Sequence, residues 1–355
     1  MTRSLNRRAA VELQFFDPAT ASRAQWQRLH GYRRQRAAED APDDPVISDA
    51  EFEAELTTER PLYQSQRILA LQGGAIVGNL VLGFRRPGSP EAGDYADHID
   101  AGGGVAAPHR RQGIGRALIA GLADFMAQRH KTIATFKVNL RDGDRFMDAI
   151  GAGCKLRTVQ NRLLLSSIDW AEMERWALLP RPRADGLRWE VHAGRVPMDV
   201  LTSLMAPLST LINQAPLGTL DQPRIRYQLE GYETWYADLD RRGGEHLMVL
   251  LRDGDEVAAV CDASWDQRFP DRVHQALTAV AAPWRGLGLA KAVKARMLLL
   301  VRQRLPQVHM VNTFNAQANA AMLSINSRLG FAVHKEEGLY QITRERMCAY
   351  LALAQ

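Results

Sequence analysis

The chain has 355 residues, of which 46% are hydrophobic and 24% are charged. This composition is typical of a globular protein with room for about two domains, and it excludes an extensively disordered chain. The formal net charge is +5, and most basic residues are arginine, but no run of five basic residues forms an arm or a tail. The charge by itself therefore predicts no nucleic-acid partner.

The three cysteines, Cys154, Cys261 and Cys348, are widely spaced and form no CxxC pair. This spacing predicts neither a disulfide framework nor a metal site, and it suits a reducing compartment. The basic segment 1–8 precedes no apolar core of signal-peptide length, and no apolar stretch approaches the ~18 residues of a membrane span. We therefore expect a cytoplasmic protein with no membrane partner and no metal. The sequence carries no signal for its oligomeric state.

The first half predicts a mixture of strands and helices. Alternating and helical hydrophobic periods predict strands at 11–16, 68–71, 75–82, 133–138 and one ending at residue 105, and helices near 21–38, 48–58 and after residue 115. Gly73 and Gly74 separate two of these strands, which predicts a hairpin. Proline and acidic residues predict a loop over 39–45. We expect a short helix and a final hairpin near 155–167 to close this half.

The second half predicts the same order of elements. We expect strands at 187–191, 246–251, 257–260, 309–314 and one ending at residue 280, with helices that begin at Pro197 and after Gly288. A hairpin at Asp253-Gly254-Asp255 joins the second and third of these strands. We therefore predict two tandem domains, at 1–175 and 186–355, joined by a proline-containing linker at 176–185.

One phrase occurs in both halves. Val105-Ala-Ala-Pro-His-Arg-Arg-Gln-Gly-Ile-Gly115 recurs as Val280-Ala-Ala-Pro-Trp-Arg-Gly-Leu-Gly-Leu-Ala290, with six of the eleven aligned residues identical. Each copy follows a predicted strand and opens a predicted helix. The repeated phrase and the repeated element order together indicate a tandem duplication.

Each copy of this phrase predicts a loop that binds an anion. Glycines let the main chain approach a ligand closely, and a helix N-terminus presents unpaired N–H groups and a positive dipole end. A Walker loop would need Gly-Lys-Ser/Thr, and a Rossmann loop would need G-x-G-x-x-G after the first strand. Neither copy meets these requirements, which leaves a coenzyme A pyrophosphate loop as the interpretation.

With this loop the chain resembles the GCN5-related N-acetyltransferase (GNAT) family. The resemblance implies an α/β fold of the α+β mixed-sheet kind, with two tandem GNAT-like domains, each a twisted mixed β-sheet flanked by helices. It also implies acetyl-CoA as co-substrate. The residues it implies for binding are Val280, Arg285, Gly286, Leu287, Gly288, Leu289 and Ala290 in the second half, and Val105, Arg110, Arg111, Gln112, Gly113, Ile114 and Gly115 in the first.

A further motif of the family is better kept in the second half than in the first. The second half keeps its spacing at Asn319, and the resemblance implies a hydrogen bond from Asn319 to the pantetheine arm. Asn326 stands where the family commonly has a tyrosine. In the first half the corresponding residues are Asp142 and Ala149, and an acidic side chain there suits an anionic cofactor poorly. We therefore expect the second half to be catalytic.

Three residues are candidates for proton transfer in the second half. Tyr340 could replace the missing tyrosine as the acid that protonates the leaving thiolate. His274 and Asp262 could act as the base that deprotonates the amine; strand alternation would place His274 on the same face as Val280. Each has a structural alternative: a packed ring for Tyr340, a hydrogen-bonded His274 and a loop-capping Asp262. In the first half Asp100 and His98 take comparable places.

The predicted function is acetyl-CoA-dependent transfer of an acetyl group to a primary amine of a small-molecule acceptor. Transfer from another acyl-CoA, or to a protein amine, is an alternative. A non-catalytic acetyl-CoA sensor is a second alternative, because the usual tyrosine is absent. A nucleic-acid binder would rest on the net charge alone, and we expect none.

Overall fold

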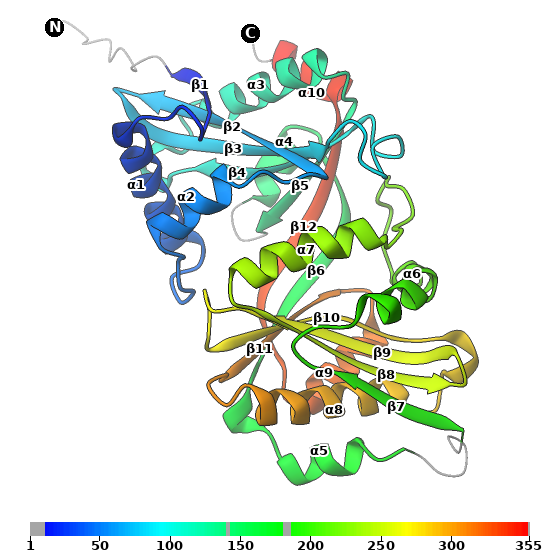
Figure 1. The fold of residues 1–355 in the computed structure, drawn as a ribbon. Helices are drawn as coiled ribbons and strands as arrows, with labels where there is room; N and C mark the ends of the chain where they lie inside the picture. The colour runs from blue at the N-terminus through cyan, green and yellow to red at the C-terminus, as the bar shows by residue number, and fades with distance from the viewer. Residues whose placement is uncertain (1–10, 140–142, 180–185, 354–355) are drawn as a thin grey trace, which may run out of the picture. The chain divides into compact units, whose positions relative to one another are not determined.

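The computed structural model describes residues 11–139, 143–179 and 186–353 and forms two compact units (Figure 1). Unit 1 consists of Met1–Lys155 together with Gly338–Gln355, and unit 2 consists of Leu156–Glu337. The expected domains, 1–175 and 186–355, differ from these units because the chain crosses between them twice. Residues 180–185 of the expected linker lie outside the described residues.

Unit 1 is a mixed sheet with helices on both faces. Its elements up to the first crossing are β1 (Glu12–Phe16), α1 (Arg23–Asp40), α2 (Asp49–Thr57), β2 (Tyr63–Gln72), β3 (Ala75–Arg85), β4 (His98–Val105), α3 (Ile114–Gln128), β5 (Ile133–Asn139) and α4 (Asp144–Ala149). The strand order is β1-β2-β3-β4-β5-β12, in which β4 and β5 are parallel. The expected hairpin between β2 and β3 is confirmed.

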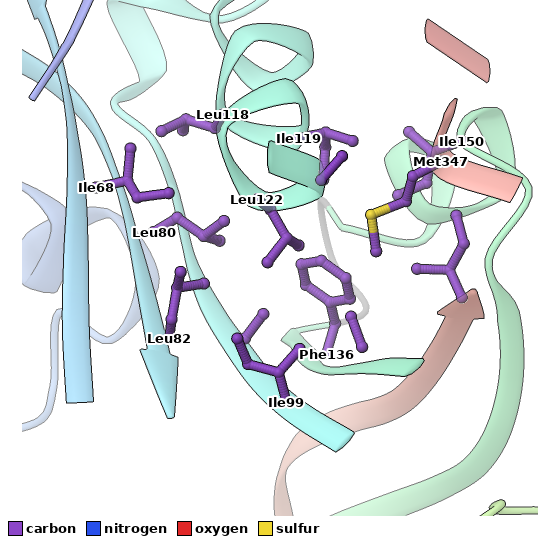
Figure 2. Close-up of a cluster of buried hydrophobic side chains, with 14 of the residues drawn as sticks. Ile68, Leu80, Leu82, Ile99, Leu118, Ile119, Leu122, Phe136, Ile150 and Met347 are labelled. Atoms are coloured by element: carbon purple, nitrogen blue, oxygen red, sulfur yellow. The ribbon is translucent and has the colours of Figure 1, made fainter. Parts of the chain in front are cut away.

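The C-terminal segment completes the core of unit 1. After the second crossing, the last part of β12 (Ala332–Thr343) lies beside β5, and α10 (Arg344–Leu353) packs against α3. Figure 2 shows Met347 of α10 among buried side chains that include Ile119 and Ile150. Tyr340 and Ile342 of β12 belong to the same cluster, so residues far apart in the chain form one core.

Unit 2 has the same plan. Its elements are α5 (Trp170–Trp176), β7 (Leu187–His192), α6 (Met198–Ile212), α7 (Leu229–Arg241), β8 (Glu245–Asp253), β9 (Glu256–Trp265), β10 (Arg272–Val280), α8 (Leu289–Arg304), β11 (Met310–Ala316) and α9 (Ala320–Leu329). Helices α6 and α7 pack on one face of the sheet and α8 on the other. The mixed α/β class and the two-fold repeat expected from the sequence are confirmed.

Strand β6 (Gly153–Leu164) corrects one prediction. Instead of a hairpin near 155–167, the chain forms a single strand that pairs along β11, from Leu164 opposite Met310 to Thr158 opposite Ala316. The buried side chain of Leu163 belongs to a unit 2 cluster with residues of α8 and β11. Hydrophobic alternation predicts that a segment is a strand, but it does not predict which strand is its neighbour.

In each unit the two central parallel strands separate towards their ends. β4 pairs with β5 only as far as Ala101, four residues before its end. β10 pairs with β11 only as far as Gln275, and a one-residue bulge against β9 follows between Gln275 and Thr278. The diverging ends leave main-chain edges of β4 and β10 that do not pair with the next strand.

In the part of the chain that is described, every helix is too short or too polar to cross a lipid bilayer.

Candidate functional site

The two loops fold as the repeated phrase predicts. Each follows the end of a strand through one short 3-10 turn and leads into a helix whose N-cap is a left-handed glycine, Gly113 with φ 86° or Gly288 with φ 76°. The other left-handed position of the loop is Gly286, with φ 78°, in unit 2 and Arg111, with φ 61°, in unit 1. The unit 2 loop therefore has glycine at both positions where a side chain would be strained.

The space beside these glycines fits an extended anionic ligand. A Cβ atom built on Gly113, Gly286 or Gly288 would have no atom within 4 Å. The first N–H groups of α3 and α8 have no intrahelical acceptor and point out of the helix end, where the helix dipole is positive. These groups would bind the pyrophosphate of acetyl-CoA through the main chain.

In unit 2 the loop arginine is held by neutral groups. The guanidinium of Arg285 donates from Nε to the carbonyl oxygen of Val280, at 3.3 Å, and also to the side-chain oxygen of Gln214. The main-chain N–H of Ala282, next to the strand end, has no hydrogen bond to any described residue. The edge of β10 therefore keeps a free donor beside a cationic side chain.

In unit 1 a carboxylate occupies the equivalent place. Glu39, in the last turn of α1, accepts hydrogen bonds from Ala107 N–H at 3.0 and 3.1 Å and lies 3.3 Å from the guanidinium of Arg110. Burial acts to raise the pKa of Glu39, but the hydrogen bonds from Ala107 and Arg36 outweigh it and lower that pKa. Glu39 falls in the segment predicted as a loop, and helix α1 brings it to the site.

The other predicted loop residues have mostly structural contacts. Leu289 and Ile114 are each 1% exposed and anchor the first turn of their helix in the core. Gln112 donates from Nε2 to the carbonyl oxygen of Pro108 at 3.2 Å. A Cβ atom on Gly115 would lie 3.0 Å from the ring of Phe146, so this glycine permits close packing. Leu287 is partly buried against the α8 cluster, and Ala290 lies in the first turn of α8.

Asn319 and Asn326 lie at the two ends of α9. Asn319 is the N-cap, and its side-chain oxygen accepts a hydrogen bond from Met322 N–H at 3.2 Å. Asn326 is 1% exposed and donates to the side-chain oxygen of Asn315 at 2.7 Å. Asn315 also accepts from Asn161, at 3.3 Å, so the residue at the usual tyrosine position helps to connect α9, β11 and β6. The role of Asn319 towards pantetheine stays a prediction.

Asp262 lies directly against the bulge of β10. One carboxylate oxygen accepts a hydrogen bond from Leu277 N–H at 3.0 Å, and the other lies 3.7 Å from Nε2 of His246. His246 is buried, and its Nδ1 lies 2.9 Å from the hydroxyl of Tyr236. Burial and the Asp262 charge together raise the pKa of Tyr227 to about 12. Asp262 therefore orients the bulged main chain and lies in a cluster of aromatic side chains.

His274 is placed by the bulge on a different face from the one expected. It pairs with Ser264, whereas Val280 pairs with Ala259. Val280 packs with the α8 cluster, but the extra residue of the bulge reverses the alternation, and His274 projects to the face of α6 and α7. Its ring lies 5.6 Å from that of Phe314.

Tyr340 does not belong to unit 2. It lies in the part of β12 that completes unit 1, is 1% exposed, and donates its hydroxyl hydrogen to Asp144 of α4. Burial, together with this hydrogen bond, raises its pKa. The expectation that Tyr340 acts beside the second loop is therefore corrected by the strand crossing. Asp142, the expected acidic counterpart of Asn319, lies outside the described residues.

A buried polar network supports the bulge of β10 from the α8 face. Lys294 of α8 donates to the side-chain oxygen of Gln275, and Gln275 donates from Nε2 to the sulfur of Cys261 at 3.2 Å. Cys261 lies 3.4 Å from the hydroxyl of Thr278. Burial lowers the pKa of Lys294 to about 8 and raises that of Cys261 to about 11. The network spans both ends of the bulge.

The stability of unit 2 is expected to rise with pH only between about 8 and 9. Above pH 8 folded Lys294 releases its proton while the unfolded lysine keeps it up to about 10.4, so the free energy of unfolding rises by about 1.4 kcal/mol per pH unit. Above about pH 9 the unfolded thiol of Cys261 ionises first, which opposes the rise.

This pH dependence is measured by urea unfolding at a series of pH values. The variant Lys294→Met should show no rise, and Cys261→Ala should extend the rise to about pH 10, where unfolded tyrosines begin to ionise. An unchanged slope in Lys294→Met would contradict the assignment of the rise to this amine.

Comparisons with known proteins agree with this geometry. Residues 26–143 match the sequence model of the family described as Acetyltransferase (GNAT) family. This match lies in the first half, whereas we expected the second half to be the more complete one. No curated protein sequence matches the chain.

Solved structures match over nearly the whole chain. A tandem GNAT protein from the clavulanic acid biosynthesis pathway has a TM-score of 0.69 and 20% identity, over 94% of this chain and 99% of that one. A GCN5-related N-acetyltransferase from Sphaerobacter thermophilus has a TM-score of 0.63 and 14% identity, over 94% and 96%. A fungal glucosamine N-acetyltransferase region within a multi-domain enzyme has a TM-score of 0.64 and 13% identity, over 94% of this chain and 38% of that one.

At these identities the structural matches establish the fold, and the family match lies within unit 1. Residues 26–143 therefore match the acetyltransferase (GNAT) family model, and the chain as a whole has the fold of a tandem GNAT protein.

Proposed function

We propose that the protein is an acetyl-CoA-dependent N-acetyltransferase that acts on a primary amine of a small molecule. The repeated loop carries this proposal, because both copies combine left-handed N-cap glycines, open space and an arginine fixed at the strand end. When bound, acetyl-CoA would supply an activated thioester. The amine nitrogen would bond to the acyl carbon as the C–S bond breaks, and the amine proton would end on the coenzyme A thiol.

The chain's own residues would bind and orient these reactants. The N–H groups at the start of α8, together with Arg285, would hold the pyrophosphate. The diverging end of β10, with the free N–H of Ala282, would pair with the pantetheine arm. Asp262 holds Leu277 N–H at the bulge and would be the carboxylate nearest to the reacting amine in unit 2. We keep the cytoplasm as the expected location.

Each unit has an observation that supports it as the catalytic one. In unit 2, the loop has glycine at both left-handed positions, and no carboxylate of the described residues pairs with its arginine, which favours an anionic cofactor. In unit 1, a large cavity adjoins the diverging end of β4. We retain unit 2 as the expected catalytic unit and unit 1 as the second candidate.

A second function, acetyl-CoA binding without turnover, is favoured by Asn326. The amide at the usual tyrosine position is buried, donates to Asn315, and cannot release a proton at neutral pH. Tyr340, the expected replacement, lies in unit 1. If the protein only binds acetyl-CoA, calorimetry should detect acetyl-CoA binding, but adding any amine of the panel should release no free coenzyme A thiol.

Separate substitution of the two loop glycines tests the proposed function. Gly288→Val and Gly113→Val each place a branched side chain at a left-handed position beside the ligand space, and the affected loop should lose at least about tenfold in acetyl-CoA affinity. Calorimetry measures the affinity, and thiol release with an amine panel measures turnover.

Gly254→Val is the matched control. Gly254 has φ 58°, is equally open, and lies in the turn of the β8–β9 hairpin outside the sequence of both loops, so it carries similar strain without changing a loop residue. Turnover lost only in Gly288→Val would assign transfer to unit 2, and turnover lost only in Gly113→Val would assign it to unit 1. The function would be refuted if wild-type protein bound no acetyl-CoA.

A further inference from the structure

Unit 1 contains a cavity of about 1030 Å³ on the sheet face that α2 covers. This volume is at the upper end of the range for small-molecule sites. Small side chains of neighbouring strands form its floor, namely Ser65, Val81, Gly83, Gly102 and Thr135. Gly102 lies where β4 separates from β5, so the cavity reaches the place where β4 no longer pairs with β5.

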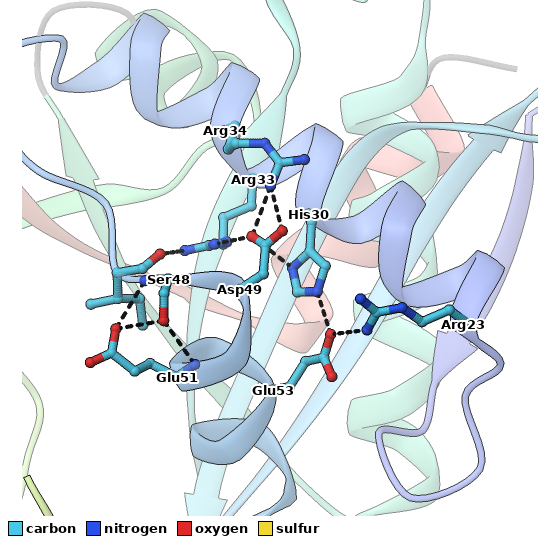
Figure 3. A network of polar contacts seen from close by, with 9 residues as sticks. Arg23, His30, Arg33, Arg34, Ser48, Asp49, Glu51 and Glu53 are labelled. Atoms are coloured by element: carbon cyan, nitrogen blue, oxygen red, sulfur yellow. Dashed lines mark hydrogen bonds and ion pairs between the residues drawn. The ribbon is translucent and has the colours of Figure 1, made fainter.

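A network of ion pairs fixes the α2 wall of this cavity against α1 (Figure 3). His30 of α1 lies 2.7 Å from a carboxylate oxygen of Glu53, and Arg33 donates to Asp49 at 2.7 Å. Both acidic residues belong to α2. The network holds Phe52, which lies between them in sequence and lines the cavity.

Two guanidinium groups lie over the ring of Phe52, and their environments differ. Arg33 lies 4.6 Å from the ring centre and is neutralised by Asp49. Arg67 of β2 lies 5.3 Å from the ring centre and lines the cavity. Among the described residues, none forms a hydrogen bond or an ion pair with the guanidinium of Arg67. Arg67 is partly buried, and its contact with the ring of Phe52 supplies no counter-charge, so its position in a cavity points to an anionic ligand.

The charge of Arg67 persists at neutral pH. Burial lowers its pKa to about 10, which reports the desolvation and still leaves the group protonated at pH 7. A planar guanidinium with five donors matches a carboxylate or a phosphate in a two-point contact.

The opposite part of the cavity carries a negative charge. Asp100 of β4 is exposed to the cavity and accepts a hydrogen bond from the hydroxyl of Tyr63 at 2.9 Å. Arg67 pairs with Val81, Val81 with Gly102, and Asp100 lies two residues before Gly102. Strand geometry therefore separates the Cα atoms of Arg67 and Asp100 by about 12 Å, so a ligand can touch both side chains only if several bonds separate its charges.

We propose that this cavity binds a small zwitterion, with its carboxylate or phosphate on Arg67 and its ammonium group on Asp100. If unit 1, the second candidate, performs the transfer, the zwitterion would be its amine acceptor; this role rests on the proposed function, whereas binding does not. Recognition of an anion by Arg67 would also explain why this cationic side chain has no counter-charge among the described residues.

Binding is tested on the full chain with four probes of similar length. 6-Aminohexanoate and 5-aminopentyl phosphate carry both charges, whereas hexanoate and 1,6-diaminohexane each lack one kind. The two zwitterions carry a carboxylate and a phosphate respectively, and the one that binds more tightly identifies which anion Arg67 prefers. Calorimetry without acetyl-CoA should show at least one zwitterion binding about tenfold or more tighter than the diamine.

Two variants test the assigned contacts. Arg67→Met should lose at least about tenfold in zwitterion affinity and should raise the melting temperature of unit 1, because it removes a partly buried charge that has no ionic partner among the described residues, at nearly constant volume. Asp100→Asn should weaken the zwitterion and leave hexanoate unchanged. Arg28→Gln is the control, because Arg28 lies outside the cavity and donates to the carbonyl oxygen of Gly74.

Acetyl-CoA affinity is measured on the same samples to separate this proposal from the proposed function. Unchanged acetyl-CoA binding with lost zwitterion binding in Arg67→Met supports both. Equal affinity for zwitterion and diamine, or a lower melting temperature of Arg67→Met with intact zwitterion binding, overturns the zwitterion site and leaves the proposed function standing.

Discussion

Replacing Met347 by alanine is expected to destabilise unit 1 by about 2–5 kcal/mol, although Met347 lies in the last helix of the chain. Its side chain is fully buried in the cluster that contains Ile119 and Ile150, as Figure 2 shows. Truncation to alanine removes buried methylene and thioether atoms and leaves a cavity. Hydrogen exchange resolved along the chain should show lost protection in 11–139 and little change in 156–337.

Leu163→Ala is the reciprocal variant. Leu163 precedes the linker expected from the sequence, yet it is fully buried in a cluster of unit 2. A similar loss, of about 2–5 kcal/mol, should appear as reduced protection in 156–337. If each variant instead weakened the half in which it lies in sequence, the exchange of β6 and β12 between the units would be disproved.

Replacing Gly103 by alanine is expected to cost about 3 kcal/mol or more in the stability of unit 1. Gly103 has φ 148°, a conformation that side-chain-bearing residues rarely adopt, and its added Cβ atom would lie 2.1 Å from the carbonyl oxygen of Asn79. The contact is with main chain of the neighbouring strand, so relief requires β3 and β4 to move apart. The diverging end of β4 would then shift.

Gly102→Ala provides the matched control for this effect. A Cβ atom on Gly102 would have no atom within 4 Å, so this variant should change stability by less than about 1 kcal/mol. Both variants are compared by urea unfolding and by acetyl-CoA calorimetry. Equal stability of the two variants would show that β4 does not need glycine at position 103.

The conformation of the two glycine-containing loops was predictable because its determinants are local. Glycine at a left-handed position, a proline in the preceding turn and apolar residues at helical spacing all act within a few residues of the chain. The structure accordingly has a helix directly after each loop, with Gly113 and Gly288 as N-caps. The side chains of Ile114 and Leu289, which were expected at the cofactor, anchor these helices in the core. The order of strands and helices follows from the same local patterns.

The partners of the loop arginines were not predictable in this way. Arg110 is adjacent to Glu39, in the last turn of α1, and Arg285 to Gln214, in the turn just beyond α6. Both partners precede their loop by many residues. The sequence predicted a loop that begins at Glu39, whereas in the structure α1 includes Glu39 and ends at Asp40. Only the packing of α1 on the sheet brings this carboxylate to the end of β4.

The candidate catalytic residues show the same limit. Alternation along a strand is reliable only while pairing is regular, and one extra residue at the bulge of β10 moves His274 to the face opposite Val280. The position of Tyr340 depends on which sheet β12 completes, and its alternating pattern fits either one. Arg67 carries no sequence signal, because its missing counter-charge is a property of the surrounding cavity.

The sequence by itself determined the repeated architecture, the two glycine-containing loops and the family resemblance, since each follows from residue types at short spacing. The tertiary structure alone decided which strands complete each unit, which face each polar side chain occupies and which charges stay unpaired. These features depend on contacts between residues far apart in the chain, and their energies arise only when burial removes water from both partners.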